Sequence, residues 1–224
     1  MGHVAALLNK SNGVGSNILQ VIATPESANA TNNNVAERKA TMASLIYGNL
    51  YHIQNGYEDW SGGFLDTRGS GCKDNLLCVS TAIKPNRDKG SGNWRIVSAE
   101  KDPPPDGSPV LANAHIYLVN QYPAFENHGG YLDTRGNGCE DNFLCVSTAK
   151  SSNRDEGSGT WRIITNSHAA EVQEDEPVHL LNGWKDFRGG FLDTRGAGCQ
   201  DNKLCVSTSE NWNRDKGSTH WRFR

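Results

Sequence analysis

A block of twenty residues occurs three times in the 224-residue chain. GGFLDTRGSGCKDNLLCVST at 62–81 returns as GGYLDTRGNGCEDNFLCVST at 129–148 and as GGFLDTRGAGCQDNKLCVST at 189–208. A second shared block follows each copy, at 86–96, 153–163 and 213–223, and an apolar segment precedes each, at 51–57, 116–122 and 178–184. Such repetition indicates three similar structural units, which we assign to 44–108, 109–171 and 172–224.

Each unit has four segments with the pattern of short β-strands. In the first unit they are Tyr51–Tyr57, Gly63–Thr67, Leu77–Thr81 and Asn93–Ser98, all rich in β-branched or aromatic residues and bounded by Gly, Asn or Asp. Three copies predict an all-β domain over 44–224 with about twelve strands. A propeller needs roughly four or more blades, and an open solenoid needs polar end repeats. We therefore expect a closed arrangement with pseudo-threefold symmetry, which hides the sheet edges.

Three four-stranded units, each with a Leu-Asp-Thr-Arg-Gly strand and a closing Trp-Arg pair, resemble the ricin-type β-trefoil lectins over residues 44–224. The resemblance implies a β-trefoil with carbohydrate sites, in which Asp66, Asp133 and Asp193 fall where that family keeps its sugar-binding aspartate. The chain departs from the family pattern in two ways. Gly92, Gly159 and Thr219 replace the Gln of the family's Gln-x-Trp motif, and the third strand reads Cys-Val-Ser-Thr where many ricin-type sites carry an aromatic residue.

Polar side chains that recur in every unit are the candidates for a carbohydrate site. An Asp accepts hydrogen bonds from hydroxyl groups, an Asn both donates and accepts, and an aromatic face packs on a sugar ring. The other reading is structural, with the same residues forming turns and ion pairs; we prefer it for Arg68 and Arg95. Besides the three aspartates, the candidates are Asn75, Asn142, Asn202, Asn86, Asn153, Asn213, Tyr57, Tyr122 and Trp184.

Each unit also contains one C-x5-C pair: Cys72 and Cys78, Cys139 and Cys145, Cys199 and Cys205. Two cysteines joined by so short a turn can reach disulfide distance, so we expect a bridge within every unit. Buried thiols are the alternative. Zinc is disfavoured because two thiolates per unit leave the usual four ligands unfilled and no His repeats with them. Disulfides favour an extracellular, secreted protein, although no secretory leader is recognisable at the N-terminus.

Residues 1–43 match no repeat, and the polar run at 27–36 is typical of a linker or extension. Such an extension can also dock on the repeat domain or form a homo-oligomer contact. No apolar run approaches the ~18 residues of a membrane-spanning helix. A formal charge of −3 argues against nucleic acid as a partner.

No nucleophile-elbow, zinc-protease, P-loop or dinucleotide motif occurs, so we expect neither catalysis nor a cofactor or metal. His52 and His179 share a repeat position and are expected to be exposed strand residues. The predicted function is a non-catalytic lectin with three equivalent sites for glycans or glycoproteins, active in agglutination or defence. The alternatives are a protein-binding β-trefoil such as a protease inhibitor, or the glycan-targeting module of a toxin. The class of sugar is left open.

Overall fold

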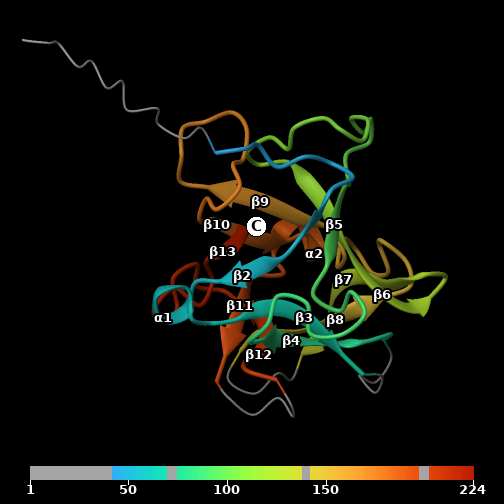
Figure 1. Ribbon diagram of the computed structural model, residues 1–224, viewed down its shortest axis with the longest axis vertical. Coiled ribbons are helices and arrows are strands. Elements are labelled where there is room, and N and C mark those ends of the chain that lie inside the picture. Colours follow the sequence, from blue (N-terminus) through green and yellow to red (C-terminus); the bar gives the residue numbers. More distant parts are fainter. Residues whose placement is uncertain (1–41, 70–74, 138–141, 197–201) are drawn as a thin grey trace, which may run out of the picture. The chain divides into compact units, whose positions relative to one another are not determined.

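The computed structural model describes residues 42–69, 75–137, 142–196 and 202–224 (Figure 1). Within these residues, thirteen strands form one continuous antiparallel sheet, joined by two four-residue helical turns. The all-β class is therefore confirmed. None of the described helices has the length and apolar character that crossing a membrane would require.

The strands follow a similar order in the three units, whereas a helical turn occurs only in the first and third units of the described chain. The first unit contains β1 (Leu50–Tyr51), β2 (Ile53–Asn55), α1 (Tyr57–Trp60), β3 (Phe64–Arg68), β4 (Cys78–Ala82) and β5 (Trp94–Ser98). The second contains β6 (His115–Phe125), β7 (His128–Asn137), β8 (Leu144–Ala149) and β9 (Trp161–Thr165). The third contains β10 (Val178–Asn182), α2 (Trp184–Phe187), β11 (Phe191–Arg195), β12 (Cys205–Ser209) and β13 (Trp221–Phe223).

Strand pairing closes the sheet into a barrel. β1 pairs with β5, β5 with β6, β6 with β9, β9 with β10, β10 with β13, and β13 with β2, which continues β1. From this ring each unit extends one hairpin, formed by β3 and β4, β7 and β8, or β11 and β12. The second strands of the three hairpins pair with one another, so the hairpins meet around a common axis. In Figure 1 the strands β3, β4, β8 and β12 gather at the lower end of the view.

The predicted core residues lie inside the barrel. Ile53, Leu65, Trp94 and Ile96 have no exposed area, and most of their counterparts in the other two units are buried as well. The indole of Trp94 also donates a hydrogen bond to the Leu65 carbonyl at 2.9 Å, a contact that recurs at the same distance in the other units. Each fully buried apolar side chain contributes about 1.5–3 kcal/mol, and the indole bond removes the cost of burying its N–H.

The segment predicted as one strand at 51–57 is interrupted at His52 and ends at Asn55, which is why the sheet has thirteen strands instead of about twelve. Beyond Asn55 the chain enters α1, where Glu58 and Asp59 have φ of 45° and 56°. The same left-handed turn occurs in α2, at Lys185 and Asp186. Left-handed backbone costs roughly 1–2 kcal/mol per residue outside glycine, so these turns depend on the surrounding fold. The pattern of apolar residues carries no information about such a turn.

Buried asparagines join neighbouring units. Asn120, at the start of the second unit, accepts a hydrogen bond from Thr67 Oγ1 at 3.1 Å and donates to the Ser91 carbonyl at 2.8 Å, both in the first unit. Asn182 and Asn55 make the same contacts at the other two junctions. All three asparagines are fully buried. Because each of these buried side-chain amides has hydrogen-bond partners in the neighbouring unit, the contacts fix how adjacent units are aligned.

Candidate functional site

The aspartate of each repeated block lies beneath the surface. Asp66, Asp133 and Asp193 have no exposed area. Arg87 donates from Nε and Nη2 to Asp66 Oδ1 at 3.2 and 3.1 Å, and Ser91 Oγ donates to Asp66 Oδ2 at 2.7 Å. A buried carboxylate needs such partners to be stable. The sugar-binding position that the ricin-type resemblance implies for these aspartates is therefore covered in this conformation.

Two side chains connect the buried Asp66 to the surface. The Arg87 side chain is 36% exposed. Asn202 comes from the third unit, is half-buried, and donates from Nδ2 to Ser80 Oγ at 2.5 Å and to Asp66 Oδ1 at 3.5 Å. Asp66 thus fixes one residue of its own unit and one residue of the neighbouring unit, side by side.

The second unit repeats this arrangement. Asp133 accepts hydrogen bonds from Arg154 Nε at 3.1 Å and Nη2 at 3.0 Å, from Ser158 Oγ at 2.7 Å, and from Asn75 Nδ2 of the first unit at 3.4 Å. Burial raises the pKa of the Asp133 carboxyl, although the Ser158 hydroxyl and the Arg154 guanidinium act in the opposite direction.

The third unit differs in one detail. Asp193 accepts from Arg214 Nε at 2.6 Å and from Asn142 Nδ2, which belongs to the second unit, at 2.8 Å. Within the described part of the chain, however, Ser218 Oγ and Asp193 Oδ1 are buried without a hydrogen-bond partner. The serine contact seen in the first two units is missing here.

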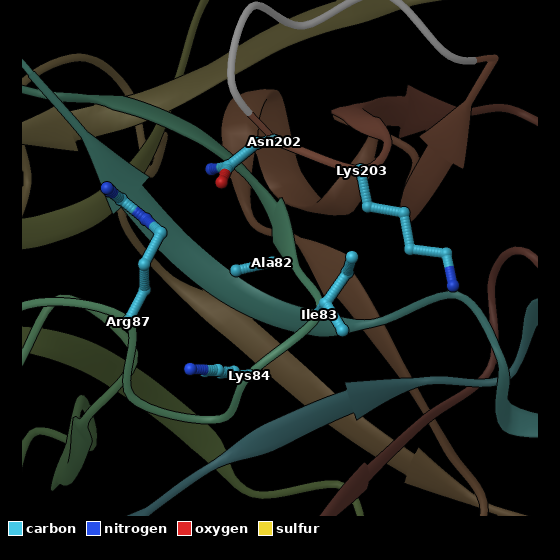
Figure 2. A pocket seen from close by; sticks show the side chains of 6 residues that line it. All are labelled: Ala82, Ile83, Lys84, Arg87, Asn202 and Lys203. Atoms are coloured by element: carbon cyan, nitrogen blue, oxygen red, sulfur yellow. The ribbon is translucent and has the colours of Figure 1, made fainter.

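Above each aspartate, the surface is hollowed between two units. The first hollow has a volume of about 410 Å³ and is lined by Ala82, Ile83, Lys84 and Arg87 of the first unit and by Asn202 and Lys203 of the third. Figure 2 shows the Asn202 amide pointing toward the Arg87 side of this hollow, with Lys203 on the opposite side and Ala82 between them. The apolar atoms of Ala82 and of the largely exposed Ile83 lie beside fixed hydrogen-bond donors, an arrangement that suits a ligand with both a hydrophobic face and oxygen acceptors.

The other two hollows occupy the equivalent positions. The second, of about 250 Å³, is lined by Lys150, Ser151 and Arg154 of the second unit and by Asn75 and Leu76 of the first. The third, of about 370 Å³, is lined by Ser209, Glu210, Asn211 and Arg214 of the third unit and by Asn142 and Phe143 of the second. Each hollow therefore combines one Arg with one Asn from the preceding unit in the cycle.

The structure brings together only part of the predicted site. Asn75, Asn142 and Asn202 line the hollows next to the arginines. The other predicted asparagines stabilise turns: Asn86 Oδ1 accepts the Gly90 N–H at 3.0 Å, and Asn153 Oδ1 accepts the Gly157 N–H at 2.8 Å. Asn213 has the corresponding exposed position in the third unit.

The predicted aromatic residues stand outside the described linings of the three hollows. Tyr57, Tyr122 and Trp184 are half-buried, and each donates its backbone N–H to the side chain of the Asn two residues earlier, at 3.0–3.2 Å. Trp184 lies beside the third hollow, because its ring is edge-on to Phe143 with 6.4 Å between the ring centroids.

Sequence reasoning passed over two groups of lining residues. The first group is Arg87, Arg154 and Arg214, which recur identically in the three units. The second is the residue after each lining Asn, which is Leu76, Phe143 or Lys203. The second group could have been found from its variation, since one position within a near-identical block carries an aliphatic, an aromatic and a cationic residue.

The described residues include one cysteine of each predicted pair. Cys78 and Cys205 begin β4 and β12, and Cys145 is the second residue of β8. None of the described cysteines is a free thiol. Cys72, Cys139 and Cys199 lie outside the described residues, as does the N-terminal extension up to residue 41, so the pairing within units and the role of the extension stay predictions.

The expectation that His179 is an exposed strand residue is wrong. Its side chain is 1% exposed, and its ring lies 4.5 Å from the His220 ring and 5.3 Å from the Trp212 ring, measured between centroids. Burial and the neighbouring His220 lower the pKa of His179 from 6.5 to about 4. Its repeat counterpart His52 is only half-buried. Within the described ranges, no group of three or more His, Cys, Asp or Glu residues is arranged to hold a metal ion.

Neither a protein-family model nor a curated protein matches this chain. Solved structures with the same fold do exist. The SDF2-like protein from Arabidopsis thaliana is 15% identical with a TM-score of 0.63, and the match covers 81% of this chain and 95% of that one. A salivary protein of the Cysteine and Tryptophan-Rich family from Culex quiquefasciatus is 18% identical with a TM-score of 0.53, covering 82% and 97%.

The receptor binding domain of botulinum neurotoxin D is also similar, at 12% identity and a TM-score of 0.53. That match covers 81% of this chain and 43% of the neurotoxin chain. At such low identity these likenesses show a shared fold, and they leave the function of this chain to its own residues.

Proposed function

We propose that residues 44–224 form a β-trefoil that binds carbohydrate, without catalysis, in the three hollows between neighbouring units. The closed ring of strands with one hairpin from each unit supports the trefoil reading. The observation that carries the binding site is the threefold recurrence of a partly exposed Arg beside an Asn from the preceding unit, both held by a buried Asp. Burying a carboxylate is energetically costly, and each of these three carboxylates holds donor side chains in place at the surface.

The donors suit a polyol. In the first unit, Nε and Nη2 of Arg87 are committed to Asp66 and to the Thr67 carbonyl. A guanidinium has five N–H donors, so its Nη1 group can donate to ligand hydroxyl oxygens. The neighbouring Asn amide adds an acceptor, and the apolar atoms of Ile83, Leu76 or Phe143 can pack on the carbon face of a sugar ring. In this proposal Asp66 and its counterparts position the ligand-binding residues.

Three weak sites on one rigid domain give avidity on a glycan-coated surface. We therefore propose agglutination of glycosylated cells, and a location outside the cell, which the absence of free thiols among the described cysteines supports. The neurotoxin receptor binding domain among the structural neighbours is compatible with a targeting role, and it supports the fold only.

A glycan array followed by an NMR titration tests the proposal. The array supplies a ligand, and the Nε–H signals of Arg87, Arg154 and Arg214 are then followed as it is added. We expect these three signals to shift, while the Nε–H signal of Arg95, which donates to the Gly48 carbonyl at 3.1 Å, stays in place. An array without binding, or a ligand that leaves all three signals unmoved, would overturn the proposal and favour a protein-binding trefoil.

A further inference from the structure

The three hollows share their buried layer and differ in the charge of their rims. In each hollow the Arg is already neutralised by its buried Asp partner. The remaining ionised lining residues are Lys84 and Lys203 in the first hollow, Lys150 in the second and Glu210 in the third. The net charges of the described rims are therefore +2, +1 and −1.

Three cationic side chains lie on different sides of the two apolar residues of the first hollow, the buried Ala82 and the largely exposed Ile83. Arg87, Lys84 and Lys203 extend from different sides of the hollow, with Ala82 and Ile83 between them (Figure 2). Lys203 donates one hydrogen bond to the Ser61 carbonyl, which leaves two of its three N–H donors for a ligand. The nearby carboxylate of Glu58 is paired with Lys216 at 2.8 Å, so it is already partly neutralised.

The other hollows lack this arrangement. In the second, the Lys150 ammonium lies 4.7 Å from the ring centroid of Phe125, and Leu76 stands where the first hollow has Lys203. In the third, Phe143 replaces Lys203, and Glu210 adds a negative charge. A carboxylate at the rim repels an anionic ligand, while the Phe143 ring favours the apolar face of a neutral one.

We propose that the three hollows are not equivalent: the first binds a sugar that carries an anionic substituent, and the third binds a neutral sugar. This inference rests on the proposed function of the hollows. Attraction between an anionic group and the exposed Lys84 and half-buried Lys203 is moderate and falls as salt is added.

The test is an NMR titration of the full chain with N-acetylglucosamine, its 6-sulfate and glucuronic acid, at low and high salt. The Nε–H signals of Arg87, Arg154 and Arg214 report the hollows separately. We expect the sulfated sugar and glucuronic acid to shift the Arg87 signal at lower concentration than the other two signals. Neutral N-acetylglucosamine should shift the Arg214 signal at the lowest concentration. The acidic preference should weaken in high salt.

Three variants locate the effect. K84Q/K203Q should lower the affinity of the first hollow for the acidic sugars by about tenfold. K101Q, which removes an exposed lysine outside the hollow linings, should leave the affinities for the acidic sugars unchanged. E210Q/N211K should give the third hollow an acidic preference that it lacks, so the inference can still be tested if the first double variant folds poorly.

The outcomes separate the two proposals. If all three arginine signals respond alike to neutral and acidic sugars, and K84Q/K203Q changes nothing, this inference is overturned and carbohydrate binding stands. If no sugar moves any of the three signals, carbohydrate binding in the hollows is overturned, and this inference with it. Inorganic sulfate that moves the Arg87 signal where no sugar does would make the first hollow an anion site, which also contradicts both proposals.

Discussion

The buried layer under the hollows and the rims around them have opposite patterns of variation among the three units. The layer repeats almost without change: a buried Asp holds a partly exposed Arg and a half-buried Asn from the neighbouring unit in each copy. The rim changes at every unit, from Ile83 and Lys84 to Lys150 and Ser151 to Glu210 and Asn211. The positions that are identical in the three units therefore hold the units together, and the positions that vary are those where ligand preference can differ.

The largest expected effect separates a buried ion pair from an exposed one. Arg87→Ala leaves the Asp66 carboxylate buried without its countercharge, which should lower the free energy of unfolding by about 3–5 kcal/mol. Arg95→Ala removes a pair with Asp106 in which the side chains are 42% and 62% exposed, and should cost about 1 kcal/mol or less beyond lost packing and the lost hydrogen bond to the Gly48 carbonyl. Urea unfolding of both variants measures the difference. Equal losses would show that the buried layer is not what holds this region.

The next effect separates the buried His179 from an exposed histidine, His168. Because the pKa of folded His179 is about 4 and that of an unfolded His is near 6.5, the unfolded chain gains a proton first as the pH falls. The stability present above pH 6.5 is lost between 6.5 and 4, by about 3 kcal/mol. The raised pKa of Asp133 acts in the opposite direction, since it favours the folded state as the carboxyl becomes protonated.

Chemical unfolding at several pH values checks this effect. His179→Gln should flatten the acid dependence between pH 6.5 and 4, whereas the same change at the exposed His168 should not. An unchanged acid slope in His179→Gln would contradict the assignment of this effect to the buried ring.

A smaller effect compares two serines at one repeat position. Ser91 Oγ donates to the Asp66 carboxylate, and Ser218 Oγ has no partner within the described chain. Ser91→Ala should lower the free energy of unfolding by about 1.5–3 kcal/mol, which is typical of a hydrogen bond to a charged group. Ser218→Ala should change it little. Thermal unfolding of the two variants decides the matter, and equal losses would mean that the third unit has the same contact as the first.

The smallest effect concerns the turn asparagines. Asn86→Ala removes the acceptor of the Gly90 N–H and should lower the free energy of unfolding by about 0.5–1.5 kcal/mol. Glycan binding should be unchanged, because Asn86 lies in the turn outside the described lining of the first hollow. Titration of this variant with an array-selected glycan checks the point. If the folded variant loses most of its affinity for the glycan, the carbohydrate site includes the turn at Asn86.

Much of the fold followed from the sequence because its signal is local. Alternating apolar residues and glycine-bounded strands predicted the four strands of each unit within a few residues, and Trp94 and Leu65 are buried as expected. The left-handed turn of α1 contacts the third unit, and the burial of His179 depends on Trp212 and His220, which lie far along the chain in its own unit, so no local pattern reveals either feature.

The candidate site was only partly predictable for the same reason. Asn202 and Arg87 are 115 positions apart in the chain and lie in one hollow only because the first and third units meet. Asp66 was predicted at the correct place in the repeat, but its role changes with burial, and burial is a property of packing. The sequence pattern alone does not distinguish a surface Asp from one covered by the next unit.

A crystal structure of the chain with a glycan selected on an array would show whether glycans bind in the hollows between units. We expect a sugar ring in at least one hollow, within hydrogen-bond distance of Arg87 and Asn202 or of their counterparts. A sugar bound instead against the turns at Trp60 or Phe187, or in the hollow at Tyr47 and Leu111, would show that the hollows are not the carbohydrate sites.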